Sequence, residues 1–194
     1  MSDQLLNQAK DILQLNWRDG FTVPTNKLYP FQWNWDSGFT ALGHSHFNLQ
    51  RAIQEIDTLF SAQWSNGMIP HIVFHSENEN SYFPNHDFWN SNVNVGAPIR
   101  PKSSGITQPA VHGFILEFIT NRFPDHLDWH EFLRKIFPRV VDSHRFLYNY
   151  RDPESEGLMS IIHPWESGRD NSPLWDDALD AIKIDPENLP AYER

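Results

Sequence analysis

No cysteine occurs among the 194 residues of the chain. This absence excludes disulfides, thiolate catalysis and cysteine-based zinc sites, and it suits a reducing compartment. Basic residues are also few, because 15 Lys and Arg stand against 25 Asp and Glu, for a formal net charge of −10 with His neutral. An acidic chain without a basic cluster lacks the electrostatic footprint of a nucleic-acid-binding protein, so no nucleic-acid partner is expected.

Long apolar runs are missing as well, since polar residues such as Glu117 interrupt each candidate, and no membrane-spanning segment is predicted. The first residues have neither the basic region nor the apolar core of a secretory signal, so we expect a cytoplasmic protein. The chain also lacks the GxSxG, phosphate-loop and dinucleotide fingerprints, which argues against serine hydrolase, kinase and dehydrogenase chemistry. With 39% hydrophobic residues, it can bury one sizeable core.

Two histidine pairs, His44-x-His46 and His71-x3-His75, have spacings compatible with metal ligation, but no HExxH helix accompanies them. The acidic turn at 152–157 imitates the first half of a calcium loop, yet His163 stands where a bidentate Glu is needed. This turn is instead expected to be solvated. We therefore predict no metal site and no cofactor.

Apolar residues recur at helical spacing in segments 3–16, 39–46, 49–60, 109–119 and 129–147, and a short last helix is expected at 173–183. Ser2 and Asn48 are candidate N-caps, and Pro138 is expected to kink the fifth helix or start a new one. An extended segment is expected at 28–36, where aromatic and polar residues alternate, and a β-like run at 158–162. The expected core faces include Leu5, Leu6 and Ile12 in the first helix, Phe114 and Phe118 in the fourth, and Phe137 in the fifth. The pattern predicts an all-α protein with a site at one end of its helices.

Aromatic and polar residues gather outside these helices, in 28–36, in the region of about forty residues from 67 to 107, and in 163–173. A pyranose offers an apolar C–H face and a ring of hydroxyls, so flat rings beside carboxylates suit a sugar. The alternative, that the Trp residues anchor loop bases in the core, stays open. The groups that carry this interpretation are Trp33, Trp35 and Asp36; His71 and Tyr82; and Trp165 and Asp170.

Glycoside hydrolysis requires one carboxyl group to protonate the leaving oxygen and a second to activate water or attack the sugar. Asp170 is a candidate for the acid because Gly168 shapes its loop and Ser172-Pro173 starts a helix just after it. Glu166 is either a neighbouring carboxylate or a cap for backbone N–H groups.

Four runs occur in order along the chain: LYPFQWNWDSG at 28–38, GMIPH at 67–71, GITQP at 105–109 and HPWESGRDNSP at 163–173. Together they resemble glycoside hydrolase family 63, and within it the bacterial-type mannosylglycerate and glucosylglycerate hydrolases. The resemblance covers nearly the whole chain. It implies an (α/α)6 toroid and an inverting mechanism on an α-linked sugar.

By these motifs the resemblance implies that Asp170 is the general acid. The segment Tyr82–Pro84 resembles a mobile loop that closes over the glycerate end. Cations or hydroxyls near that end are expected from Arg100, Lys102 and Tyr82. The substrate-binding residues implied are Tyr29, Trp35, Asp36, His71, Tyr82, Gln108 and Trp165.

The resemblance also implies a general base, a Glu from the second half of the toroid, and the chain ends at Arg194 before such a segment. Six or seven expected helices, against twelve in a toroid, agree with this. We therefore expect residues 1–194 to be the N-terminal part of a single catalytic domain whose C-terminal part is absent, and self-association could cover its exposed core. The alternatives are a non-catalytic sugar-binding remnant and a trehalase-like or oligosaccharide-processing α-glucosidase.

Overall fold

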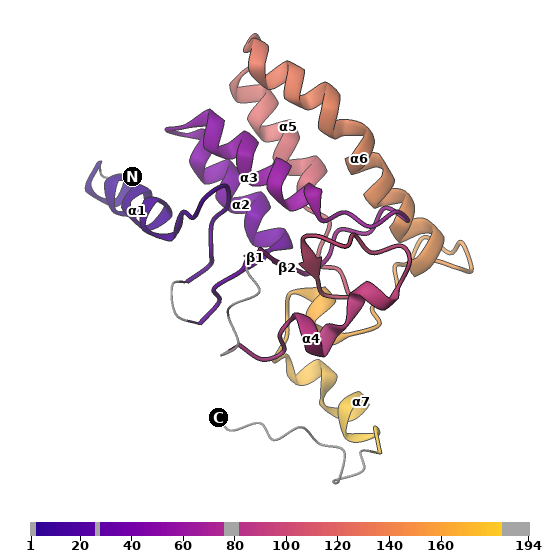
Figure 1. Cartoon of the computed structure of the whole chain (residues 1–194). Coiled ribbons are helices and arrows are strands. Elements are labelled where there is room, and N and C mark those ends of the chain that lie inside the picture. Colours follow the sequence, from indigo (N-terminus) through magenta and orange to yellow (C-terminus); the bar gives the residue numbers. More distant parts are fainter. Residues whose placement is uncertain (1–2, 26–27, 76–81, 184–194) are drawn as a thin grey trace.

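A computed structural model describes residues 3–25, 28–75 and 82–183 (Figure 1). Figure 1 shows α2, α3, α5 and α6 running beside one another, with β1, β2, α4 and α7 gathered near one end of them. The elements are α1 (Asp3–Asn16), β1 (Gln32–Trp33), α2 (Asn34–Ser45), α3 (Leu49–Ser61), β2 (Ile72–Phe74), α4 (His86–Trp89), the 3₁₀ turn η1 (Ser91–Val93), β3 (Lys102–Ser103), α5 (His112–Arg122), α6 (Leu127–Arg151), the 3₁₀ turns η2 (Pro164–Ser167) and η3 (Pro173–Trp175), and α7 (Asp176–Asp180).

The core lies where α2, α3, α5 and α6 meet. Asn48 caps α3 as predicted, because its side-chain oxygen accepts a hydrogen bond from Arg51 N at 3.1 Å. The predicted apolar stripe of α3 is buried there through Ile56, Leu59 and Phe60. Removing this stripe from water is the main favourable contribution to the packing of the four helices.

The expected core faces of two other helices are partly wrong. α5 buries Ile115 and Ile119 as expected, but Phe114 and Phe118 are exposed and contact each other with ring centroids 4.6 Å apart. Phe137 is exposed on α6. In each helix a narrower apolar stripe is buried against the neighbouring helices than the sequence pattern indicated. An amphipathic pattern does not show how wide the buried stripe is.

α6 runs without interruption through its internal proline for 25 residues, so the expectation of a new helix at Pro138 is wrong. α1 has the expected bounds, but none of its residues is buried, and Leu5, Leu6 and Ile12 are exposed. The core is formed without α1. Among the described helices, α1 packs mainly against α2. The predicted cap Ser2 lies outside the described residues.

A three-stranded antiparallel sheet in the order β1-β2-β3 was not predicted. Trp33 pairs with Ile72, and Val73 pairs with Ser103. The extended segment expected at 28–36 is shorter than predicted, because α2 begins at Asn34. Strands of two or three residues are too short to show an alternating pattern, and the β-like run at 158–162 forms no strand.

The start of α2 is fixed by hydrogen bonds of the Asn34 side chain. The Asn34 amide donates to Ile69 O at 3.1 Å, and its oxygen bonds with His112 Nε2 at 2.7 Å. These bonds hold the first turn of α2 against α5 and the segment before β2. Among the described helices, none is long and apolar enough to cross a bilayer.

Candidate active site

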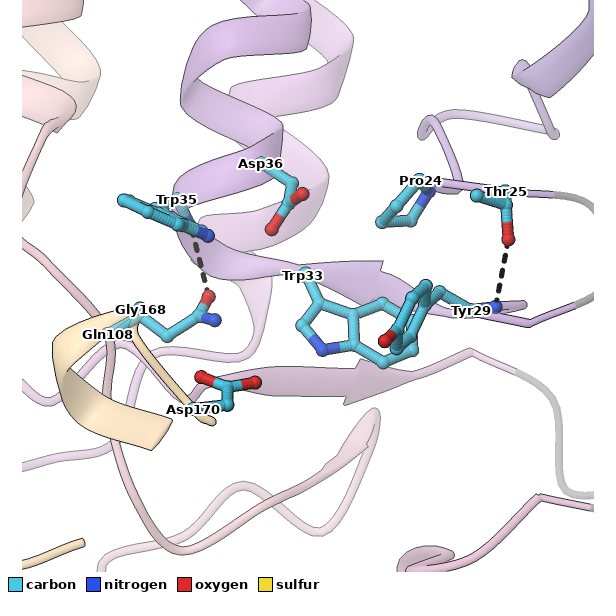
Figure 2. Close-up of a pocket in the computed structure, with 9 residues that line it drawn as sticks. All are labelled: Pro24, Thr25, Tyr29, Trp33, Trp35, Asp36, Gln108, Gly168 and Asp170. Carbon is cyan, nitrogen blue, oxygen red and sulfur yellow. Dashed lines mark hydrogen bonds between the residues drawn. The ribbon is translucent and has the colours of Figure 1, made fainter. Parts of the chain in front are cut away.

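One cavity of about 250 Å³ lies between the first turn of α2 and the loop that follows η2 (Figure 2). Segments far apart in the sequence meet there. Aromatic faces, two carboxyl groups and one amide share its wall. The lining residues are Pro24, Thr25, Tyr29, Trp33, Trp35, Asp36, Gln108, Gly168 and Asp170.

Trp35 stands in one wall of the cavity and is held from two directions. Its backbone N–H donates to Gln108 Oε1 at 3.2 Å. Its indole packs against Gly168, where an added Cβ would lie 2.6 Å from the ring. Gly168 also has φ of +68°, which other residues rarely adopt. The predicted need for a glycine in this loop therefore has two physical causes.

Asp36 and Asp170 point into the same space from opposite sides of the cavity (Figure 2). Burial, and to a lesser degree the charge of Asp170, raise the pKa of Asp36 above its ordinary value. Partial burial also raises the pKa of Asp170, against a backbone hydrogen bond and the charge of a protonated His163, both of which lower it. Arg169 forms no ion pair with Asp170 within the described part of the chain. A carboxyl group in this environment keeps its proton to a higher pH than one in water, as a general acid must.

The structure places five of the predicted site residues at this cavity, and the other three are not part of its lining. His71 is buried, and its ring lies 5.7 Å from Trp165 and 6.4 Å from Trp33. The centroid of the Tyr82 ring lies 5.8 Å from that of Trp33. Burial lowers the pKa of His71 to about 3, so its imidazole is neutral. His71 and Tyr82 therefore pack against Trp33, and Trp165 packs against His71. The five at the cavity are Tyr29, Trp35, Asp36, Gln108 and Asp170.

Trp33, Pro24, Thr25 and Gly168 line the cavity without having been assigned to it. Trp33 stood in the right aromatic group and could have been found from its alternation with Trp35, since it ends β1 and faces Tyr29 at 5.3 Å. Pro24 and Thr25 carry no signal in the sequence. They reach the cavity through the folding of the segment between α1 and β1.

Glu166 is not a second carboxylate of this cavity. It is buried, and it accepts hydrogen bonds from Thr107 N, Ile162 N and Arg151 Nη2. The cap that the sequence offered as an alternative is therefore the observed role. Lys102, a candidate for the glycerate end, bonds with His86 Nδ1 at 3.2 Å.

The turn at 152–157 is closed by Asp152, whose carboxylate accepts from Glu156 N at 2.8 Å and Gly157 N at 2.9 Å. The turn is exposed at residues 153–157, as expected, and only Asp152 within it is buried. In residues 3–25, 28–75 and 82–183, no three His, Asp or Glu side chains are grouped so as to hold a metal ion.

Carboxyl groups with raised pKa beside aromatic faces, on a helical scaffold, are the features of a glycoside hydrolase. The model of the mannosylglycerate hydrolase MGH1-like glycoside hydrolase domain matches residues 29–194. The chain belongs to this family.

The relatives are named for two substrates. The chain is 41% identical to a mannosylglycerate hydrolase of Rubrobacter radiotolerans, over 99% of this chain and 43% of the relative. It is 40% identical to a glucosylglycerate hydrolase of Mycolicibacterium hassiacum, over 98% of this chain and 44% of the relative. The chain thus spans less than half the length of these curated relatives.

A solved structure shares the fold. The crystal structure of the GH63 mannosylglycerate hydrolase from Thermus thermophilus in complex with Tris matches with a TM-score of 0.88 and 45% identity, over 98% of this chain and 44% of that one. The same enzyme has also been solved with Tris and D-glycerate, with a TM-score of 0.85. The predicted fold, an N-terminal portion of an (α/α)6 toroid, is confirmed.

Proposed function

We propose that the protein containing this chain is an inverting hydrolase of a small α-glycoside, mannosylglycerate or glucosylglycerate. The observation that carries the proposal is the convergence of Asp36 and Asp170 with three aromatic side chains on one cavity, in a chain of this family. A cavity of about 250 Å³ suits a single sugar ring better than an oligosaccharide.

In this proposal Asp170 protonates the glycosidic oxygen as the bond to the sugar breaks. Its raised pKa favours this role, because the acid must carry a proton before the reaction. Asp36 and Gln108 bind sugar hydroxyls, and the faces of Tyr29 and Trp35 pack against the C–H face of the ring. Direct contacts of His71, Tyr82 and Trp165 with substrate stay predictions, since these residues are not part of the cavity lining.

An inverting reaction also requires a base that activates water on the opposite face of the sugar. Among the described carboxylates, only Asp36 and Asp170 line the cavity, and Asp36 has a binding role here. We propose that the base comes from the second half of the toroid, which the matched relatives are long enough to contain.

The decisive substitution is Asp170→Asn, which keeps the size of the side chain and removes its transferable proton. In a coding-region product long enough to span the relatives, turnover should fall by about 10²–10⁴-fold with substrate binding retained. Asp142→Asn, at an exposed position on α6, is the matched control and should leave turnover unchanged. Full turnover in the Asp170 variant would refute the assignment.

Sugar binding without hydrolysis is the second candidate for the 194 residues alone, because they span only 43% of the Rubrobacter relative. Release of sugar from α-mannosylglycerate, α-glucosylglycerate and trehalose would be measured for this chain and for the longer product. Activity in the longer product alone supports a base outside this chain. Activity in the short chain would make Asp36 the first candidate for the base, and trehalose as the best substrate would favour a trehalase-like enzyme.

A further inference from the structure

A buried ion pair lies beneath the loop that carries Asp170. Arg151 Nη2, at the end of α6, donates to Glu166 Oε1 in η2 at 2.8 Å, and the two side chains are 10% and 3% exposed. The Arg151 guanidinium also lies over the Phe146 ring, 5.0 Å from its centroid. Taking two opposite charges out of water costs about as much as their attraction returns, so stability alone does not explain the pair.

All three described partners of the Glu166 carboxylate are hydrogen-bond donors. Oε1 accepts from Arg151 Nη2 and from Thr107 N at 3.2 Å, and Oε2 accepts from Ile162 N at 3.1 Å. An ionised carboxylate satisfies donors on both oxygens, whereas an amide turns an NH₂ group toward one of them. The site therefore requires a Glu and not merely a side chain of that size.

The segments that Glu166 joins lead to both walls of the cavity. Thr107 directly precedes Gln108, whose Oε1 accepts from Trp35 N. On the other side, Glu166 comes two residues before Gly168, which packs on Trp35, and four before Asp170. One buried carboxylate thus connects the wall formed by Gln108 to the loop that carries the acid.

We propose that Glu166, held by Arg151, is a positioning residue that sets the place of Asp170 relative to the wall formed by Gln108 and Trp35. Glu166 itself does no chemistry, because it is buried and does not line the cavity. The inference rests on the proposed role of Asp170 as general acid. Loss of the carboxylate lets the acid shift from the glycosidic oxygen, and a displacement of about 1 Å can cost about 10²-fold in rate.

The test compares two substrates that differ in their need for an acid. A glycerate glycoside requires a proton on its leaving oxygen, whereas the α-glycosyl fluoride of the same sugar releases fluoride with little proton assistance. Both are measured in the full-length product for the wild type and for Glu166→Gln, Arg151→Met, Arg151→Lys and Asp170→Asn. Lys135→Gln, which breaks the exposed ion pair with Asp57, is the control.

We expect Glu166→Gln to lower kcat on the glycoside about 10²-fold, with a change in KM of less than about threefold and a much smaller loss on the fluoride. Arg151→Lys should retain more glycoside turnover than Arg151→Met, because it keeps a charged donor. Lys135→Gln should match the wild type. If Glu166→Gln does not fold, the double variant Glu166→Gln/Arg151→Met leaves no unpaired charge and should show the same preference for the fluoride.

Equal losses on both substrates in a folded Glu166 variant would overturn the inference, as would unchanged kinetics. The role of Asp170 is judged separately. If Asp170→Asn lowers turnover of the glycoside and of the fluoride equally, the proposed acid is wrong and the inference fails with it. If Asp170→Asn spares the fluoride and the Glu166 variants do not, only the positioning role is refuted.

Discussion

Glu55 is a fully buried carboxyl group inside the helical core, and its substitution by Gln should change stability in a pH-dependent way. Its Oε1 accepts hydrogen bonds from Ser37 Oγ at 2.6 Å and Gln32 Nε2 at 2.9 Å. An amide oxygen at the same place can accept both bonds. Glu55→Gln therefore removes the titration while it keeps the packing and most of the hydrogen bonding.

Burial raises the pKa of Glu55 from its ordinary 4.5 to about 7, against hydrogen bonds from Ser37, Thr22 and Gln32 that lower it. A carboxyl with a raised pKa in the folded state holds its proton more tightly there than in the unfolded chain. Its contribution to stability is complete below pH 4.5 and is lost as the pH rises through 7. The difference between the two pKa values corresponds to about 3 kcal/mol.

The assay is urea unfolding of wild type and Glu55→Gln, followed by tryptophan fluorescence, between pH 4 and 9. The two proteins should have similar free energies of unfolding at pH 4.5, and the variant should gain relative stability up to about 3 kcal/mol above pH 7.5. The difference between the proteins isolates Glu55, because they share every other titrating group. Glu117→Gln, at an exposed position on α5, is measured alongside as a control for the substitution itself. A flat difference for Glu55→Gln would refute the assignment of a raised pKa.

Two further predictions concern the loop glycine and the buried histidines. Gly168→Ala should lower the free energy of unfolding by about 1–3 kcal/mol and reduce kcat/KM, because it combines a strained backbone with a collision against Trp35. Gly157 is the control, with φ of +79° and no atom within 4 Å of an added Cβ. Gly157→Ala should therefore lower stability without loss of activity. Burial lowers the pKa of His44 and of His112 to about 4, so the unfolded chain binds protons first. These histidines therefore oppose the trend of Glu55 as the pH drops from 6.5 toward 4. The variant His112→Gln should gain stability relative to the wild type over this range, and a difference between the two proteins that does not change with pH would contradict the reasoning.

Much of the helical scaffold could be predicted because its pattern is local. The cap at Asn48 and the stripe of α3 follow from spacing and side-chain chemistry within one helix. The exposure of Phe114 and the separateness of α1 could not be predicted in this way. Both depend on which helices become neighbours in the folded structure, and the spacing of apolar residues within one helix does not determine this.

The candidate site was predicted in its parts but not in its arrangement. Sequence runs pointed to Trp35, Asp36, Gln108 and Asp170, which the structure places at one cavity. Nothing in the sequence separated these residues from His71, which lies one layer deeper. The sequence does not distinguish an aromatic side chain that lines a cavity from one that packs against the lining. The distance of each ring from the cavity could therefore be learned only from the structure.

The cavity draws its lining from Pro24 at one end of the described chain and from Asp170 near the other. During synthesis, the first wall leaves the ribosome long before the second exists. The aromatic wall cannot contact the loop after η2 until that loop has been synthesised. Contacts between residues so distant in sequence form late and slowly. The pocket is therefore complete only after the loop that follows η2 has been synthesised and has packed against Trp35.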